Sequence, residues 1–177
     1  MKRTVIALFA VCVCVANAEI PNPAFGEADG GGINQISAHF GQSVRGGMEE
    51  LFIAELCYSQ PNRFFRFPGR QNIEFLTQQG IGGFSDYNQA LIFGFSQDMI
   101  TPGFWRMYAG INLGIYIKGK KTGRIGSEFT FGERVFLGYR VTKDYILELY
   151  GRHFSNGGLT EKNAGQNFIG LSAARNF

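Results

Sequence analysis

Cysteine is scarce in this chain, and so are the motifs that hold metals and cofactors. Of the three cysteines in 177 residues, Cys12 and Cys14 lie near the N-terminus and Cys57 stands alone. A disulfide-stapled scaffold is therefore excluded, and the lone Cys57 is expected to be inert. The sequence has no metal-ligand spacing, phosphate-binding loop or cofactor motif. We therefore expect neither a metal nor a cofactor.

A strong charge imbalance and a long apolar run are missing as well. The chain has 17 Lys and Arg residues against 14 Asp and Glu residues, a formal net charge of +3. Nothing in that balance indicates a nucleic acid partner. The apolar run over residues 5–15 is too short for a transmembrane helix, which needs about 20 residues.

The short apolar run is instead typical of a secretory signal. Lys2 and Arg3 precede it, and Ala16-Asn17-Ala18 follows as an A-x-A cleavage site. We predict a signal peptide over residues 1–18, cleaved after Ala18. Residues 19–32 are rich in proline and glycine and are expected to form a loose lead-in to one domain over residues 33–177.

What the chain does contain is glycine (25 residues), phenylalanine (18 residues) and alternating apolar and polar positions. Eight segments alternate: 33–44, 49–59, 70–81, 87–97, 105–118, 128–141, 145–155 and 166–177. Their lengths fit tilted membrane-spanning strands of about 9–11 residues. Residues 60–69 and 98–104 are expected to be turns.

These features predict an all-β fold, an eight-stranded antiparallel transmembrane β-barrel. A short turn at residues 141–144 and longer connections at 118–127 and 156–165 fit a barrel whose longer loops face outward. The aromatic C-terminal residue, Phe177, is the usual ending of a barrel delivered to the bacterial outer membrane. An eight-stranded barrel has an interior filled by side chains, so a porin is not expected.

The predicted strand over residues 145–155 carries the most informative residues. Its apolar face, which would contact lipid, ends in His153 and Ser155. A neutral imidazole can take the proton of a serine hydroxyl and make it a nucleophile toward an ester. The backbone N–H groups of Asn156 to Gly158 follow at once and are candidates for holding an oxyanion. The alternative is that both side chains simply lie in the interfacial zone, where polar groups cost little.

The tail RHFSNGGLTEKNAGQNFIGLSAARNF resembles the C-terminal signature of the outer-membrane lipid A 3-O-deacylases (PagL-type). The stretches FRFPGRQN and FTFGERVFLGYR are also similar, so the resemblance spans most of the chain after the signal. It implies hydrolysis of an acyl ester of lipid A in lipopolysaccharide, with Ser155 as nucleophile and His153 as base. Asn156, Gly158 and Asn163 match positions that shape the oxyanion site.

One position departs from the family pattern. Asn167 stands where the family has the triad glutamate and, by alternation, faces lipid on the same side as His153. An amide can orient an imidazole but does not stabilise the imidazolium as a carboxylate does. Two functions therefore stay open: an active lipid A deacylase, or a barrel of the same ancestry that has lost catalysis and serves as a structural or surface-binding protein.

A carboxylate from another strand is a candidate substitute. Glu133 lies on the lipid face between Phe131 and Val135, and antiparallel pairing predicts that it lies within about two residues of His153. Its alternative role is that of a structural residue shielded at the aromatic girdle. Glu161 is a second candidate.

The remaining charged residues fall into two groups. Lys118, Lys120, Lys121 and Arg124 form a basic cluster that is either a solvated loop or a binding site for lipopolysaccharide phosphates. Side chains expected inside the barrel form a salt-bridge network, and these are Glu148, Arg152, Arg134 and Arg140. His39 is expected in the lumen or girdle. The sequence leaves a homodimer open.

Overall fold

The computed structural model describes residues 33–177 except 45–49, 66, 82–88, 102 and 104. The predicted signal peptide and lead-in lie outside the described residues. Eight antiparallel strands pair in chain order, and the first pairs with the last to close a barrel. The strands are β1 (Gln35–Ser43), β2 (Glu50–Phe64), β3 (Phe67–Ile81), β4 (Ala90–Ile100), β5 (Met107–Lys118), β6 (Phe129–Arg140), β7 (Tyr145–Ser155) and β8 (Gln166–Asn176). The predicted eight-stranded antiparallel barrel is confirmed.

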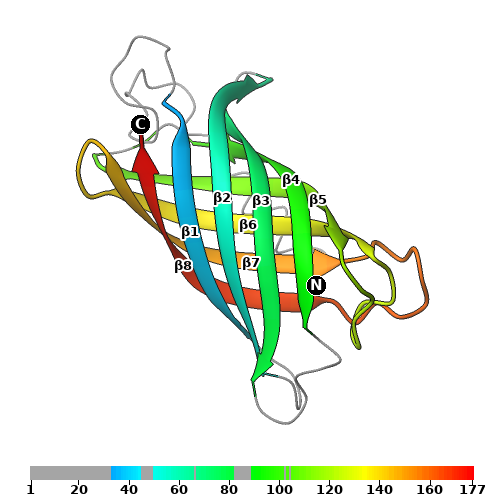
Figure 1. The fold of residues 1–177 in the computed structure, drawn as a ribbon. Coiled ribbons are helices and arrows are strands. Elements are labelled where there is room, and N and C mark those ends of the chain that lie inside the picture. Colours follow the sequence, from blue (N-terminus) through cyan, green and yellow to red (C-terminus); the bar gives the residue numbers. More distant parts are fainter. Residues whose placement is uncertain (1–32, 45–49, 66, 82–88, 102, 104) are drawn as a thin grey trace, which may run out of the picture.

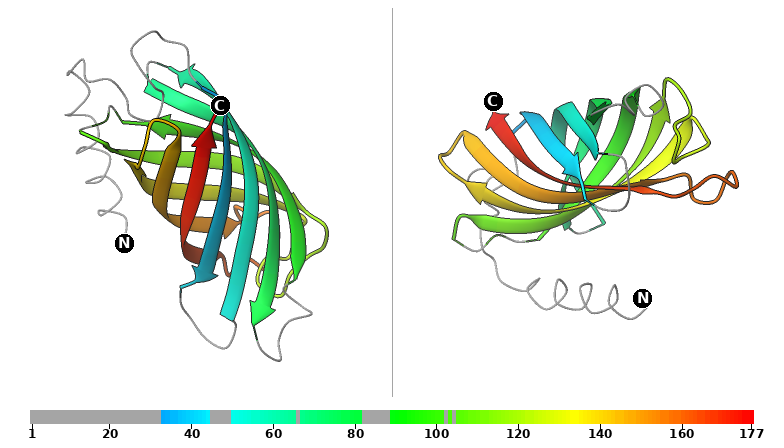
Figure 2. Two further views of the ribbon diagram at one scale, coloured as in Figure 1. Left: turned by 60° about the vertical axis from the view of Figure 1, so that its left-hand side comes forward. Right: turned by 90° about the horizontal axis from the view of Figure 1, so that it is seen from below.

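The strands are steeply tilted. In Figure 1 the strands β1 to β3 of the near wall cross the strands β5 to β7 of the far wall, and Figure 2 shows the same ring from two further directions. We call the end of the barrel that carries residues 119–128 and 156–165 the loop end, and the opposite end the turn end. At the turn end the chain closes on itself, because the Phe177 N–H donates to the Asn34 carbonyl at 2.9 Å.

The two predicted turns are wrong in part, because strands extend into both. Residues 60–64 and 67–69 belong to β2 and β3, which have 15 residues each, and Phe65 lies in the turn between them. Prolines in this stretch are typical of turns, but Pro61 and Pro68 lie where β2 and β3 pair only with each other, and such edges tolerate proline. β4 likewise continues to Ile100, past the predicted turn start at residue 98.

The outside of the barrel is an apolar belt. Outward-facing side chains from every strand leave a third to two thirds of their surface exposed, among them Ile36, Phe40, Leu56, Phe75, Phe93, Leu113, Val135, Leu149 and Leu171. Such a belt is stable only against lipid, so the barrel spans a membrane. Among the described residues, no helix is long and apolar enough to cross a membrane.

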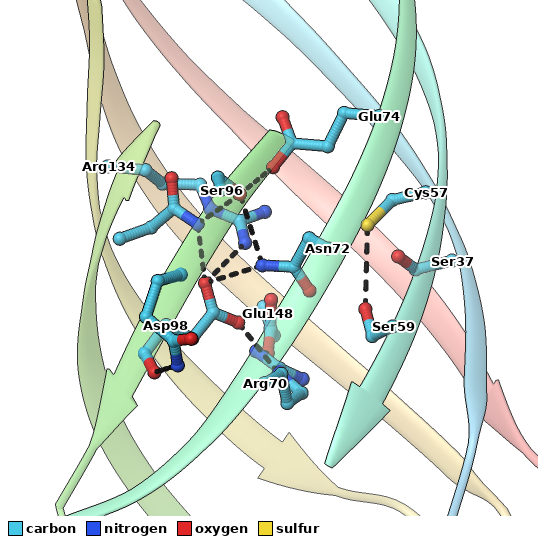
Figure 3. Close-up of polar contacts among 12 residues, drawn as sticks. Ser37, Cys57, Ser59, Arg70, Asn72, Glu74, Ser96, Asp98, Arg134 and Glu148 are labelled. Atoms are coloured by element: carbon cyan, nitrogen blue, oxygen red, sulfur yellow. Dashed lines mark hydrogen bonds and ion pairs between the residues drawn. The ribbon is translucent and has the colours of Figure 1, made fainter. Parts of the chain in front are cut away.

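The lumen is filled, as predicted. An apolar cluster that includes Tyr116, Phe154 and Phe168 packs at the loop end, and one that includes Tyr108, Phe136 and Tyr150 packs toward the turn end. The lumen also holds a buried polar network, part of which is drawn in Figure 3. Its ion pairs include Arg70–Asp98 (2.7 Å), Arg70–Glu148 (2.8 Å), Arg134–Asp98 (3.3 Å), Arg152–Glu74 (3.0 Å) and Arg152–Glu55 (2.5 Å).

This network explains why β4 does not end at residue 98. Asp98 is fully buried and bonded to two arginines, so its carboxylate needs the strand that points it inward. The predicted roles of Glu148, Arg152 and Arg134 in the network are confirmed. Arg140 is not part of it: its guanidinium bonds the Thr142 and Lys143 carbonyls of the β6–β7 turn instead, at 3.2 and 2.8 Å. The reason is position, because Arg140 is the last residue of β6.

Candidate active site

His153 and Ser155 are the last two outward-facing residues of β7, at the loop end. Both side chains are half-buried in the barrel wall. The register places His153 directly between Glu133 of β6 and Asn167 of β8. The predicted position of Glu133 beside His153 is confirmed. Three residues with acid–base or hydrogen-bonding chemistry thus share one row across three adjacent strands.

The His153 imidazole is oriented by Asn167. Its Nδ1 lies 2.7 Å from the Asn167 side-chain oxygen. An amide oxygen only accepts hydrogen bonds, so Nδ1 carries the proton and Nε2 is left with a lone pair. This is the tautomer that a general base needs.

A glycine closes the other side of the imidazole. Gly165 has a φ of +65°, and a Cβ atom built on it would lie 2.8 Å from His153 Cε1. Only glycine therefore fits both the backbone conformation and the contact. Sequence reasoning did not assign Gly165 a role. A glycine inserted among the polar residues just before β8 was the available signal.

Ser155 is held at the end of β7 through its backbone. Its carbonyl accepts a hydrogen bond of 2.6 Å from the Thr130 hydroxyl on β6. Among the described residues, no hydrogen bond joins the Ser155 hydroxyl to His153. Such bonds are commonly long in substrate-free sites and shorten when substrate binds, so this geometry is compatible with a nucleophile and its base.

Asn156 builds the turn that follows. It is fully buried, and its Nδ2 donates to the Thr160 hydroxyl at 2.6 Å and the Lys162 carbonyl at 3.2 Å. Its Oδ1 accepts the Gly158 N–H at 3.0 Å. Gly157 and Gly158 have φ values of +62° and +84°, so this compact loop depends on glycine at both positions.

The predicted oxyanion residues are therefore not equally available. The Gly158 N–H is bonded to Asn156, and the Asn156 N–H is bonded to Asn163 Oδ1 at 3.0 Å. Asn163 Oδ1 accepts that hydrogen bond, so the donor group of the side chain is its Nδ2 amide. Asn163 is exposed, so its amide is open to a ligand at the barrel surface.

The group that bonds His153 Nδ1 is Asn167 and neither of the two candidate acids. Glu133 is exposed on the outer wall, and among the described residues no ion pair joins it to His153. Because Asn167 holds Nδ1, Glu133 can act on the imidazole only through its field. Glu161 is exposed in the loop between β7 and β8.

The basic cluster divides into three parts. Lys118 is not a surface residue: it is 2% exposed, and its Nζ lies 3.4 Å from the Thr122 hydroxyl inside the loop end. Alternation explains this, because even-numbered residues of β5 face the lumen. Arg124 bonds the Gly165 carbonyl at 2.9 Å. Lys120 and Lys121 are exposed.

One buried group in the lumen has the composition of a metal site. Ligand atoms of His39, Glu55 and Cys57 lie within 4.8 Å of one another. An Arg134 N–H donates to His39 Nδ1 at 2.8 Å, so the proton of the neutral ring sits on Nε2, the atom that would face a metal. Arg152 also pairs with Glu55. These arginines and the tautomer disfavour a cation here.

The two sequence comparisons agree on one family. A family model described as lipid A 3-O-deacylase (PagL) matches residues 28–176. The lipid A deacylase PagL of Bordetella bronchiseptica is 39% identical over 54 residues, which are 30% of this chain and 30% of that relative. The chain thus matches less than a third of that relative's length.

Two solved structures share the fold. One is the outer membrane enzyme PagL, at TM-score 0.57 and 17% identity, covering 79% of this chain and 97% of that one. The other is neisserial surface protein A, at TM-score 0.57 and 14% identity, covering 81% and 96%. The match of the family model over most of the chain, on this barrel, shows that the protein belongs to the lipid A 3-O-deacylase (PagL) family of outer-membrane β-barrels.

Proposed function

We propose that the protein removes the acyl chain ester-linked at the 3-O position of lipid A, in the outer leaflet of the bacterial outer membrane. The observation that carries the proposal is the 2.7 Å bond from His153 Nδ1 to Asn167, on the lipid-facing wall next to Ser155. It leaves the imidazole ready to accept a proton beside a serine hydroxyl. A lipid ester can reach this position without leaving the membrane.

The reaction follows from these groups. Ser155 Oγ attacks the ester carbonyl carbon while His153 Nε2 takes the hydroxyl proton. The tetrahedral intermediate collapses, the bond to the sugar oxygen breaks, and the imidazolium returns its proton to that oxygen. Water, deprotonated by His153, then attacks the acyl-serine ester and releases the fatty acid and free Ser155.

The Asn163 amide is the donor best placed for the oxyanion. The Asn156 side chain supports it by building the loop, and the Asn156 backbone N–H donates to Asn163 Oδ1 at 3.0 Å. The Gly158 N–H joins only if its bond to Asn156 opens on substrate binding. Fixed donors of this kind supply roughly 3–4 kcal/mol of transition-state stabilisation in serine hydrolases.

The negative charge of the substrate phosphates is matched by lysines at the loop end. Lys120 and Lys121 are exposed in the connection between β5 and β6, at the same end of the barrel as Ser155, and they suit the phosphates of lipid A. Lys118 is buried and is not part of this surface. Glu133 and Asn167 flank the imidazole, and we assign orientation to Asn167 and long-range charge stabilisation to Glu133.

The test is mass spectrometry of lipid A from cells that make this protein, beside cells that make Ser155→Ala. We expect the native protein to remove one 3-O-linked acyl chain and the variant to remove none. His153→Asn should behave like Ser155→Ala. Equal loss of the chain with native protein and Ser155→Ala would disprove the serine mechanism.

A second function is favoured by Asn167 alone. A family member that lacks the carboxylate can be a barrel that has lost catalysis and serves as a structural or surface-binding protein. Unchanged lipid A in cells whose membranes hold the folded native barrel would support that reading. Loss of the acyl chain only with an intact Ser155 would reject it.

A further inference from the structure

Two connections at the loop end are hydrogen-bonded to each other. The Ala164 N–H donates to the Arg124 carbonyl at 2.9 Å, and the Gly126 N–H donates to the Lys162 carbonyl at 2.8 Å. Ile125 and Asn163 form an antiparallel bridge between these bonds. We call residues 124–126 and 162–165 together the strap. It ties the β5–β6 connection to the connection that holds the proposed oxyanion residue.

The strap is anchored in the barrel by Ile125. This side chain is 0% exposed and packs in the apolar cluster at the loop end with Tyr116 and Phe154. Its backbone is closed into a turn with Thr122, with Ile125 N–H donating to the Thr122 hydroxyl at 3.2 Å and Thr122 N–H to the Ile125 carbonyl at 3.1 Å. The backbone at Arg124, the preceding residue, is therefore held in place by the buried Ile125.

The Arg124 guanidinium contacts the other half of the strap, residues 162–165. Nε donates to the Gly165 carbonyl at 2.9 Å, and Nη2 lies 3.5 Å from the Ala164 carbonyl. Hydrogen bonds from a charged donor are roughly twice as strong as neutral ones. The side chain is half-buried, unlike the exposed Lys120 and Lys121.

The residue that Arg124 holds is the one that touches the imidazole. Gly165 packs against His153 at a distance that leaves no room for a Cβ atom. Asn163, two residues earlier, carries the amide proposed for the oxyanion. Movement of the Gly165 carbonyl by about an ångström would therefore disturb both the base and the oxyanion donor.

We propose that Arg124 is a positioning residue: it fixes the Ala164–Gly165 carbonyls so that His153 and Asn163 keep their relative geometry. This inference rests on the proposed esterase function. It replaces the expectation that Arg124 binds substrate phosphate. Misplacement of a catalytic group by about 1 Å can reduce a rate by about 100-fold.

The kinetic test compares Arg124→Gln with Lys162→Gln, each as purified full-length barrel acting on lipid A in detergent. Lys162 is exposed on the same strap, so its variant removes the same charge and leaves the Gly165 contact intact. We expect Arg124→Gln to lower kcat by about 10- to 100-fold with KM within about 2-fold. Lys162→Gln should leave both unchanged, and Arg124→Lys, which keeps a charged donor, should recover part of kcat.

A phosphate-binding role predicts the opposite pattern. Arg124→Gln would then raise KM at constant kcat, and the effect would vanish with dephosphorylated lipid A. That result would overturn the proposal. So would an equal loss of kcat in Lys162→Gln, because loop charge and not the carbonyl contact would then be responsible.

A second readout does not depend on turnover. The chain has only two histidines, so ¹³C-histidine labelling gives one ring signal from buried His39 and one from His153. We expect Arg124→Gln to shift or broaden the His153 Cε1–H signal and leave His39 unchanged. An unaltered His153 signal in a folded Arg124→Gln barrel would overturn the proposal, even if the native protein proved inactive on lipid A.

Gly165→Ala supplies an independent variant of the same contact. The added methyl group meets His153 Cε1 and strains a positive φ. We expect the same His153 signal to move and kcat to fall, with Arg124 present. Folding of each variant is verified by the altered gel migration of the unheated barrel. An unchanged His153 signal in folded Gly165→Ala would contradict the packing on which the proposal stands.

Discussion

Asn167 is the residue on which the proposed chemistry turns. Its side-chain oxygen accepts a hydrogen bond from His153 Nδ1, and the two atoms are 2.7 Å apart. Asn167 therefore orients the imidazole as the acid of a catalytic triad would. What an amide lacks is a negative charge to stabilise the imidazolium formed when Ser155 loses its proton. In a serine protease triad, Asp-to-Asn replacement lowered kcat by about 10⁴ because the amide held the wrong imidazole tautomer, a loss that the accepting Asn167 oxygen avoids here.

We therefore predict that Asn167→Asp increases the rate of deacylation. The carboxylate is isosteric with the amide, so it keeps the distance to Nδ1 and adds the missing charge. An increase in kcat of about 10- to 1,000-fold is expected, below the full triad effect because Asn167 is exposed to the interface. The measurement is initial rate on lipid A, with Asn167→Leu, which has no acceptor, expected to fall below native. A folded Asn167→Asp barrel no faster than native would contradict the assignment.

Glu133 gives a complementary prediction. It pairs across from His153 but cannot bond Nδ1, which Asn167 occupies, so its contribution is electrostatic. We expect Glu133→Gln to lower kcat by about 3- to 10-fold, an effect that corresponds to roughly 1 kcal/mol at the interface. Glu128→Gln, which removes an exposed carboxylate just before β6, is the control. Unchanged hydrolysis in Glu133→Gln while His153→Asn abolishes it would remove Glu133 from the mechanism.

The connection between β7 and β8 is a folded element in its own right. Its organiser is the buried Asn156 side chain, which uses both amide protons and its oxygen within the loop. The strap joins this connection to the neighbouring one through Ile125. The proposed oxyanion donor thus lies in a hydrogen-bonded loop and not in a loose one, which suits a group that must be preorganised.

Asn156→Asp tests the loop as a unit. Aspartate keeps an acceptor for the Gly158 N–H but loses both donated bonds and places a carboxylate opposite the Lys162 carbonyl and Thr160 hydroxyl. Each lost bond costs about 1 kcal/mol, so we expect faster protease cleavage within residues 156–165 and loss of activity. Leu159→Ser, at an exposed position of the same loop, should change neither. A protease-resistant, active Asn156→Asp would show that the loop is held by other contacts.

The strands were largely predictable because lipid-facing and lumen-facing residues alternate along each strand of a membrane barrel. The alternation found all eight strands, the outward row of His153 and Ser155, and the place of Glu133 beside them. It was wrong at residues 60–64 and 67–69, where prolines lie in strands, and at residues 98–100, where β4 continues to Ile100. In both cases the deciding contact, a neighbouring strand or a buried arginine, is distant in sequence.

The site was less predictable than the strand that carries it. His153, Ser155 and Asn167 follow from periodicity and family resemblance. The occupied N–H groups of Asn156 and Gly158 do not, because they depend on how a loop folds back on itself. Nor does the burial of Lys118 stand out among the basic residues around it, although its even position on β5 was a usable signal.

The barrel as a whole is stabilised by ion pairs in the lumen and by contact of its apolar belt with lipid. Arg152 is paired with Glu55 and Glu74, and all three side chains are buried. We predict that Arg152→Ala destabilises the barrel by about 3–5 kcal/mol, because two carboxylates lose their partner. Urea unfolding in lipid vesicles measures it. Arg175→Ala, an exposed arginine on β8, is the comparison, and equal midpoints for both variants would argue against a structural role for the network.

The position of Ser155 on the outer wall, with a lumen closed by side chains, has a consequence for kinetics. In the proposed reaction, enzyme and substrate meet by diffusion in two dimensions, so the quantity that sets the rate is the mole fraction of lipid A in the surface around the barrel. Adding inert detergent at constant bulk lipid A should slow the reaction in proportion to surface dilution. In a bacterium, the packing of neighbouring lipids would then govern turnover as much as the amount of protein.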